Sequence, residues 1–449
     1  MTGRGNPTLS LVSQGLAFAI PVIIAAYWPI YAVSPGFAVA IFRPAVIGAT
    51  MLLALLWYRS PLTLAEAKVA GLIAMLAIAF LLPSIAATDP GRAFTDWAKL
   101  MILCVMSLLL CRALRDSSTA KALGLSLIVA STIIAALIVV TYFRYMGLVI
   151  PTYNSVRAFK GIAEKANVPL NTVPFASLFS YLAGMCILRR NWALWMLGVA
   201  LFVVCSGLTG SRAPVAALLA SGFALFLLQA VRSSRLLTRV TAYLVTVVIA
   251  LSIGFLLMHL TSKQLSEVTE GRWDLWSVAV TKFTERPILG HGYESWRDDL
   301  VSRLPGEYKL TGRMAMMIAG GYHNEYLTIV AEEGLVGLIP TLALAWFLLH
   351  ATWRLGFRNW HTWDGGRWAL FACLFLLIRA NVEVPGLFGY AQEPADYLAY
   401  IFLAIVVSRF SVEEDYVRSI IQGATRLPVQ SGIRNIPLQP RYVCREAPL

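Results

Sequence analysis

One histidine in the chain has a setting that suits proton transfer. The segment Gly321-Tyr-His323-Asn324 precedes the acidic pair Glu332-Glu333, and an apolar stretch begins at Gly334. This pattern predicts an amphipathic helix over residues 323–333, with the membrane span starting at Gly334. Because a helix N-terminus disfavours a further positive charge, we expect His323 to be neutral and able to accept a proton near pH 7.

Two arginines occupy positions that suit an anionic ligand. Arg212 lies in Gly207-Leu-Thr-Gly210-Ser-Arg212-Ala-Pro214 between two apolar stretches, and proline fits the first turn of a helix. Arg272 opens a predicted helix whose side chains Trp273, Trp276 and Val280 share one face, as in a helix lying on a bilayer surface. A guanidinium beside free backbone N–H groups can bind a diphosphate. For Arg212, contact with lipid phosphates or an acidic partner is the alternative.

The elements that position these residues are predicted to be membrane helices. Of the 449 residues 58% are hydrophobic and 14% are charged, against about 25% charged in soluble proteins. The apolar residues form blocks close to the roughly 20 residues that a helix needs to cross a bilayer. We therefore expect an all-α polytopic membrane protein with about 12 transmembrane helices. The six cysteines form no CxxC pair and predict neither a disulfide framework nor a metal site.

The expected spans lie between short connections of uneven charge. Basic residues gather in alternate connections, such as Arg112 with Arg115, Arg189 with Arg190, and Arg232. By the positive-inside rule these connections and both termini are cytoplasmic. The net charge of +13 is thus explained by the basic residues that orient the chain in the membrane, and no nucleic acid partner is expected. The predicted spans are 12–32, 38–57, 67–87, 97–114, 121–146, 173–189, 191–208, 213–231, 238–260, 334–353, 366–382 and 395–411.

The long loop at residues 261–322 then lies on the periplasmic side. Its eight basic and eight acidic residues are balanced, as is typical of that face. The predicted organisation is nine transmembrane helices in 1–260, a periplasmic helical loop with the histidine motif in 261–333, three transmembrane helices in 334–411 and a cytoplasmic tail in 412–449.

Several of these features together resemble the O-antigen ligase/polymerase superfamily. His323-Asn324, nine further residues and Gly334-Leu-Val-Gly337 follow a large outer loop. The Ser211-Arg212 turn, Arg272 and the segment Arg286-Pro-Ile-Leu-Gly290-His-Gly292-Tyr match the same pattern. So do Arg157, Lys160 and Asn171 within residues 156–174. The resemblance covers most of residues 150–340, and the first 150 residues agree in hydropathy alone.

The resemblance implies a glycosyltransferase of the membrane-embedded C type in the bacterial inner membrane, with a periplasmic active site. Such O-antigen ligases move polysaccharide from an undecaprenyl diphosphate carrier to lipid A–core. The family's two arginines and one histidine correspond to Arg212, Arg272 and His323.

The expected mechanism needs neither cofactor nor metal. His323 accepts the proton of the acceptor hydroxyl, and the arginines stabilise the leaving diphosphate in place of a metal ion, since the outer segments contain no DxD motif. Further substrate-binding residues are expected among polar side chains near this face, namely Arg157, Lys160, Asn171, Asn324 and Lys99. The acids Glu383, Glu393 and Asp396 also lie near the bilayer, without a motif that fixes their role.

Three other functions stay open from the sequence. A polymerase for O-antigen or exopolysaccharide uses the same donor and differs in its acceptor. A protein O-oligosaccharyltransferase shares the histidine motif but usually has a larger C-terminal outer portion. A transporter of lipid-linked sugars would place charges at mid-bilayer and show inverted repeats. Apart from the lipid-linked donor, the lipid A–core acceptor and membrane lipids, no partner is expected, and the chain is expected to be a monomer.

Overall fold

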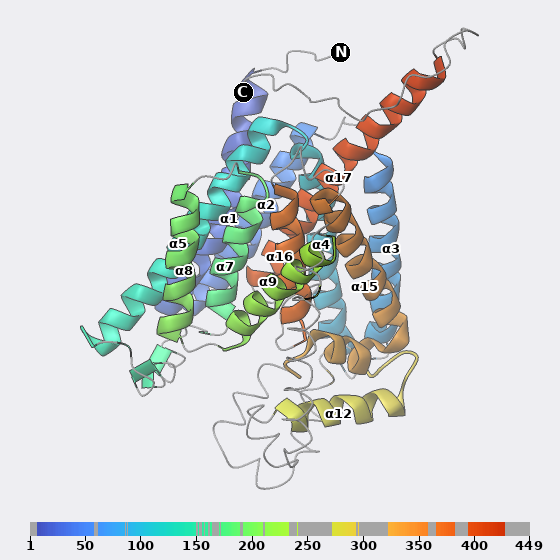
Figure 1. Cartoon of the computed structure of the whole chain (residues 1–449). Helices are drawn as coiled ribbons and strands as arrows, with labels where there is room; N and C mark the ends of the chain where they lie inside the picture. Colours follow the sequence, from blue (N-terminus) through green and yellow to red (C-terminus); the bar gives the residue numbers. More distant parts are fainter. Residues whose placement is uncertain are drawn as a thin grey trace.

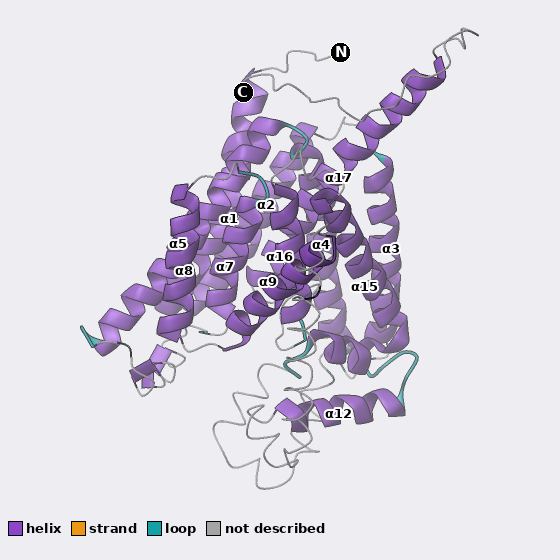
Figure 2. Cartoon of the chain, in the orientation of Figure 1, coloured by secondary structure: helices purple, strands orange, loops and turns teal. Residues whose placement is uncertain are grey.

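The protein is helical throughout the part that the structure describes. The computed structural model describes residues 7–57, 62–85, 87, 89–149, 151, 155–156, 158–159, 162–163, 170, 172–188, 192–209, 212–232, 240, 272–292, 295, 322–357, 365–381 and 394–426. No strand occurs among these residues (Figure 2). The described helices are α1 (Pro7–Val33), α2 (Pro35–Trp57), α3 (Leu64–Ile85), α4 (Pro90–Ala113), α5 (Ser117–Met146), α7 (Thr172–Met185), α8 (Trp192–Thr209), α9 (Arg212–Arg232), α12 (Arg272–Glu285), α15 (Glu325–Phe357), α16 (Gly365–Arg379) and α17 (Pro394–Arg426). The all-α prediction is confirmed.

Eight of the described helices are long and apolar enough to cross a membrane. They are α1, α2, α3, α4, α5, α8, α9 and α15, and each overlaps a predicted span. The predicted span at 395–411 lies within α17, and the one at 238–260 lies outside the described residues. The membrane class is thus confirmed, whereas the total of about twelve spans and the C-type architecture stay predictions.

Two predicted spans form shorter helices than expected. α7 has 14 residues and α16 has 15, which at about 1.5 Å per residue fall short of the roughly 30 Å hydrocarbon core. All residues of α7 are buried, because α5, α8, α16 and α17 pack around it. A helix enclosed by other helices does not meet lipid, so its length is not set by the bilayer.

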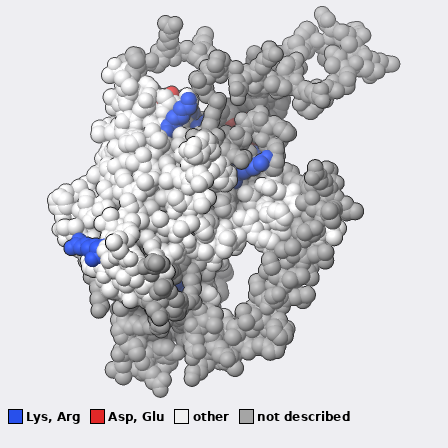
Figure 3. Space-filling model, turned by 60° about the vertical axis from the view of Figure 1, so that its left-hand side comes forward, with Lys and Arg blue, Asp and Glu red and all other residues white. Residues whose placement is uncertain are grey.

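The outer surface of the helices is apolar. Large side chains such as Leu55, Ile78, Val140, Val203 and Trp346 are each more than half exposed. On the face drawn in Figure 3, the described surface carries only a few charged side chains. Because a soluble protein does not expose apolar patches of this extent, the surface is suited to contact lipid.

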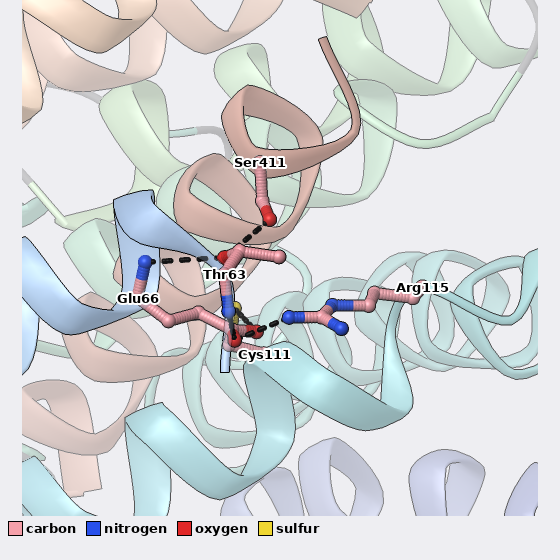
Figure 4. A network of polar contacts seen from close by, with 5 residues as sticks. All are labelled: Thr63, Glu66, Cys111, Arg115 and Ser411. Carbon is pink, nitrogen blue, oxygen red and sulfur yellow. Dashed lines mark hydrogen bonds and ion pairs between the residues drawn. The ribbon is translucent and has the colours of Figure 1, made fainter. Parts of the chain in front are cut away.

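The helices run back and forth between two ends of the bundle. At the end that we name the Glu66 end, polar contacts join the start of α3 to the end of α4 and to α17 (Figure 4). Thr63 and Glu66 form a capping box, with N···O distances of 2.9 and 3.3 Å. Glu66 also forms an ion pair with Arg115 and accepts a hydrogen bond from the Cys111 thiol at 3.3 Å. The Ser411 hydroxyl lies 2.6 Å from that of Thr63.

The opposite end holds the turn at Tyr322–Asn324, and we name it the His323 end. Helix α12 lies there across the end of the bundle, beside the first part of α15 (Figure 1). Figure 1 also places the start of α1 and the last turns of α17 at the other end. The described helices therefore place the histidine motif and the two described chain ends at opposite ends of the bundle, as the expected topology requires.

Helix α15 is broken at the glycine where the sequence predicts the span to begin. Gly334 has φ 61° and ψ −158°, which are not helical values, so the outer part Glu325–Glu333 and the span are two helices in series. The predicted break is confirmed. The outer part differs from the expected amphipathic helix, because Glu325, Glu332 and Glu333 are all buried. Neighbouring segments cover the side on which these acids lie.

Candidate active site

His323 lies in a tight turn directly before α15. Its φ of 51° is in the left-handed region, which a residue other than glycine adopts only when its surroundings hold it there. Its side chain is partly exposed, while Tyr322 and Asn324 on either side are buried. The turn thus presents the imidazole at the surface of the His323 end on a fixed main chain.

Asn324 supplies the cap of the outer helix. Its Oδ1 accepts a hydrogen bond from the N–H of Leu327 at 3.0 Å, which is the bond expected of an N-cap residue. Its Nδ2 donates to the carbonyl of Asn381 at 2.8 Å. Both parts of the amide are therefore engaged with main-chain groups, one in α15 and one just beyond α16.

A second main-chain contact holds the same two helices together. The N–H of Glu325 donates to the carbonyl of Ala380 at 2.8 Å. The first N–H groups and the last carbonyls of a helix have no hydrogen-bond partner within that helix. Here an N–H group at the start of α15 and a carbonyl at the end of α16 provide partners for each other. The start of α15 is fixed against the end of α16 by contacts that involve no exposed side chain.

Helix α12 approaches the histidine turn through a tryptophan. The Trp276 Nε1 donates a hydrogen bond to the carbonyl of Tyr322 at 3.0 Å. Arg272 is the first residue of α12, as predicted, and lies one turn before Trp276 on the same side of the helix. The structure thus brings the helix that carries Arg272 into contact with the turn that carries His323.

The faces of α12 differ in part from the prediction. Trp273 and Val280 are about half exposed, at 45% and 50%, as expected for a surface helix. Trp276, which was expected on the same face, turns toward Tyr322 instead. Leu275 and Ala279 form the buried side.

The segment after α12, residues 287–292, packs against the break in α15 at Gly334. The N–H groups of His291 and Gly292 donate to the carbonyls of Ala331 and Glu332, at 3.2 and 2.8 Å. In the other direction, the N–H groups of Leu335 and Val336 donate to the carbonyls of Pro287 and Ile288, at 2.9 and 3.1 Å. Four main-chain hydrogen bonds therefore join the 287–292 segment to the break.

Two glycines make this close approach feasible. A Cβ on Gly290 would lie 2.2 Å from the carbonyl oxygen of Glu332, and one on Gly334 would lie 2.4 Å from that of Ile288. Both glycines also have positive φ, of 66° and 61°. The sequence showed Gly290 as part of a family pattern and gave it no role. The structure shows that its lack of a side chain lets the two main chains touch.

A hydrogen bond of the His291 side chain joins this segment to the end of α12. Its Nε2 lies 3.0 Å from the carbonyl of Lys282, and because a carbonyl can only accept, this nitrogen carries the hydrogen. Glu285 lies 3.5 Å from the same nitrogen. Burial lowers the pKa of His291, which favours the neutral ring. Lys282 is itself buried and donates from Nζ to the carbonyl of Ser295 at 2.8 Å.

For the other predicted site residues, the structure describes the main chain, the side chain or neither. Arg212 is the first residue of α9, whose start lies toward the His323 end (Figure 1), and Pro214 is in its first turn. The side chain of Arg212 lies outside the described part of the structure. Lys99 is partly exposed, nine residues after the start of α4. Among the remaining candidates, Asp396 is buried, and the residues outside the described part are Arg157, Lys160, Asn171, Glu383 and Glu393.

Part of the sequence that forms this site is similar to a known protein family. Residues 197–342 match the sequence model of a family described as O-antigen ligase. No curated protein matches the chain. The matched segment contains Arg212, Arg272 and His323, together with Trp276 and the glycines of the break. Over residues 197–342 the chain is thus similar to the O-antigen ligase family, which confirms the resemblance seen in the sequence.

Proposed function

We propose that this protein is an O-antigen ligase, which transfers polysaccharide from undecaprenyl diphosphate to a sugar hydroxyl of lipid A–core. The reaction would take place at the periplasmic face of the bacterial inner membrane, with both chain termini cytoplasmic. The observation that carries the proposal is the contact between α12 and the histidine turn. It places the helix of Arg272 beside His323 within a segment that matches the O-antigen ligase family.

In this proposal His323 is the general base. The acceptor hydroxyl oxygen attacks the anomeric carbon of the carrier-linked sugar, and its proton passes to the imidazole. The bond from the anomeric carbon to the diphosphate breaks, and the electron pair leaves with the diphosphate. A positioned general base contributes about 10²–10⁴-fold to such a step. The partly exposed position of His323, between the buried residues Tyr322 and Asn324, supports the role, because the turn holds the imidazole at the surface.

The diphosphate would be bound by the two arginines. Arg272 and Arg212 are the first residues of α12 and α9, and the start of a helix favours the binding of an anion. Charge on the leaving diphosphate grows as the bond breaks, and fixed cations stabilise it without a metal ion. Arg157, Lys160, Asn171 and Lys99 are proposed to bind further parts of the substrates.

For Asn324 the geometry favours a structural contribution to the same site. Its amide oxygen and nitrogen already bind Leu327 and Asn381. Its side chain is also almost fully buried. We therefore propose that Asn324 holds the turn that presents His323, in place of the substrate contact expected from the sequence.

One experiment tests the function. Purified protein would be incubated with undecaprenyl diphosphate-linked glycan and lipid A–core, and wild type would be compared with His323→Ala and Arg212→Ala. We expect glycan-capped lipid A–core from wild type and a loss of at least about 100-fold in both variants. His350→Ala is the matched control, since His350 is exposed on the span of α15 far from the break.

The same experiment separates the alternatives. Longer carrier-linked chains without capped lipid A–core would identify a polymerase. Glycan attached to an added acceptor protein would identify an O-oligosaccharyltransferase. Movement of intact carrier-linked glycan across the bilayer of a vesicle, without transfer, would identify a transporter.

A further inference from the structure

We propose that Trp276 is a positioning residue for His323, acting through the peptide group that joins Tyr322 to His323. This inference rests on the proposed function of His323 as the base. It concerns a residue on a different helix, 47 positions earlier in the chain, that the reaction itself does not require.

The contact is made to the peptide group that directly precedes His323. The indole N–H of Trp276 is a donor only, and it points to the carbonyl oxygen of Tyr322 at 3.0 Å. A peptide group is planar, so this oxygen and the N–H of His323 lie in one rigid unit. Holding the oxygen therefore holds the plane from which the His323 side chain projects.

The turn requires such support from outside. His323 has a φ of 51°, and a residue with a side chain does not keep this conformation by its own preference. From the following side the turn is held by Asn324, whose amide binds Leu327 and Asn381. On the preceding side Trp276 contributes a hydrogen bond to the carbonyl of Tyr322, so the turn is held at both its ends.

Trp276 is suited to this task because α12 is held independently of it. Leu275 and Ala279 on the same helix are buried, with exposed fractions of 0% and 1%. At the other end of α12, the Nζ of Lys282 donates to the carbonyl of Ser295, and the main-chain carbonyl of Lys282 accepts from the Nε2 of His291. The indole therefore extends from a fixed helix, and α12 does not depend on the indole for its own position.

This arrangement predicts a specific kinetic effect. Trp276→Phe keeps an aromatic ring and removes the N–H, so the Tyr322 carbonyl loses this donor and the peptide plane is held less firmly. A misaligned imidazole accepts the proton less readily, and we expect kcat to fall about 5- to 10-fold, as for the loss of one hydrogen bond. KM for the carrier-linked donor should change less than about twofold, since α12 keeps its own contacts.

The test is a double-mutant cycle on the purified full chain. The rates of wild type, Trp276→Phe, His323→Ala and the double variant are measured with carrier-linked glycan and lipid A–core. If Trp276 acts through His323, Trp276→Phe slows the wild type but leaves the residual rate of His323→Ala unchanged. An equal slowing in both backgrounds would overturn the inference, and so would an unchanged kcat in Trp276→Phe.

Two further variants keep the result interpretable. Trp273→Phe is the matched control, because Trp273 lies on the same helix and is about half exposed, and its kcat should stay at the wild-type value. If Trp276→Phe does not fold, replacing the indole by its benzothiophene analogue keeps the ring shape and removes only the donor. Full activity of His323→Ala would refute the proposed base, whereas an inactive His323→Ala with normal Trp276 variants would refute the positioning role alone.

Discussion

The Nδ2 of Asn324 donates to the carbonyl of Asn381 at 2.8 Å, and this bond crosses from the start of α15 to the end of α16. The same side chain caps α15 through its oxygen, so a single amide holds two helix ends at the turn of His323. Because the two bonds use different atoms of the amide, substitutions can separate the cap from the contact between helices.

Asn324→Asp tests the contact between helices. A carboxylate still accepts the hydrogen bond from Leu327, but it cannot donate to Asn381 and instead faces another oxygen. We expect the free energy of unfolding to fall by about 1–3 kcal/mol and kcat to fall with it. Asn324→Ala removes the cap as well and should lose about 1 kcal/mol more. Thermal unfolding in detergent and turnover of the folded fraction measure both effects, and wild-type values for Asn324→Asp would contradict the assignment.

Gly290→Ala and Gly334→Ala test the close packing of the 287–292 segment against α15. Each added Cβ would lie less than 2.5 Å from a main-chain oxygen, and each residue has positive φ. We expect little folded protein from either variant, because neither main chain can move without breaking the hydrogen bonds between them.

Gly147→Ala is the control for these two variants. Gly147 also has a φ of 66°, but nothing lies within 4 Å of an added Cβ. It should therefore lose only the backbone strain of about 1–3 kcal/mol that a residue with a side chain has at this φ and ψ. The yield of folded protein and the unfolding temperature distinguish these variants from the control. An equal loss of stability in all three variants would show that overlap between the added Cβ and the opposite main chain is not the cause of the loss.

Glu66→Gln tests the polar cluster at the opposite end of the bundle. The amide can still accept the capping hydrogen bond of Thr63, but Arg115 loses the charge of its partner (Figure 4). Since Glu66 is fully buried, we expect the free energy of unfolding to fall by about 1–3 kcal/mol. The kcat of the folded fraction should be unchanged, since the cluster lies far from His323.

The control for Glu66→Gln is an ion pair at the same end that is open to water. Lys68 lies 3.5 Å from Glu414 and is half exposed, and such pairs contribute about 0–1 kcal/mol. Lys68→Ala should therefore leave the unfolding temperature almost unchanged. A loss of kcat in Glu66→Gln, at full stability, would contradict this expectation and show that the two ends of the bundle are coupled.

The pH dependence of stability should depend on His291. Burial holds its pKa below the ordinary value of about 6.5, so the unfolded chain binds a proton more readily than the folded one. The stabilisation is complete above pH 6.5 and is lost as the pH falls from there through the lower, folded pKa. His291→Gln keeps an N–H donor for the Lys282 carbonyl and does not titrate.

Unfolding temperatures measured between pH 7.5 and 5 check this expectation. The fall with acidification should be smaller in His291→Gln than in wild type. It should persist in His323→Ala, which shows whether the effect on stability is independent of the proposed base. An identical pH profile for wild type and His291→Gln would exclude the assignment.

Metal removal should leave the reaction intact. The proposed cations for the leaving diphosphate are Arg212 and Arg272, which EDTA does not affect. We expect full transfer activity after chelation and no stimulation by added Mg²⁺ or Mn²⁺. Loss of activity in EDTA and recovery with either ion would reject the role given to the arginines.

The sequence predicts the helices well because their signals are local. Apolar blocks mark the spans, Arg272 marks the start of α12 and Gly334 marks the break in α15. Contacts between distant segments leave no such signal. Nothing in the sequence pairs Trp276 with Tyr322, and the acids Glu332 and Glu333 were expected to face water because charged residues usually do. Their burial follows from tertiary packing around the break, where the 287–292 segment binds.

The four main-chain bonds at the α15 break also bear on how the protein is made. The 287–292 segment leaves the ribosome before Leu335 and Val336, whose N–H groups it must bind. Since a chain grows from its N-terminus, this segment is without its partner until Leu335 and Val336 have been made. It completes its structure only when the start of the next span arrives. The insertion of α15 is thus also the step that assembles the histidine motif.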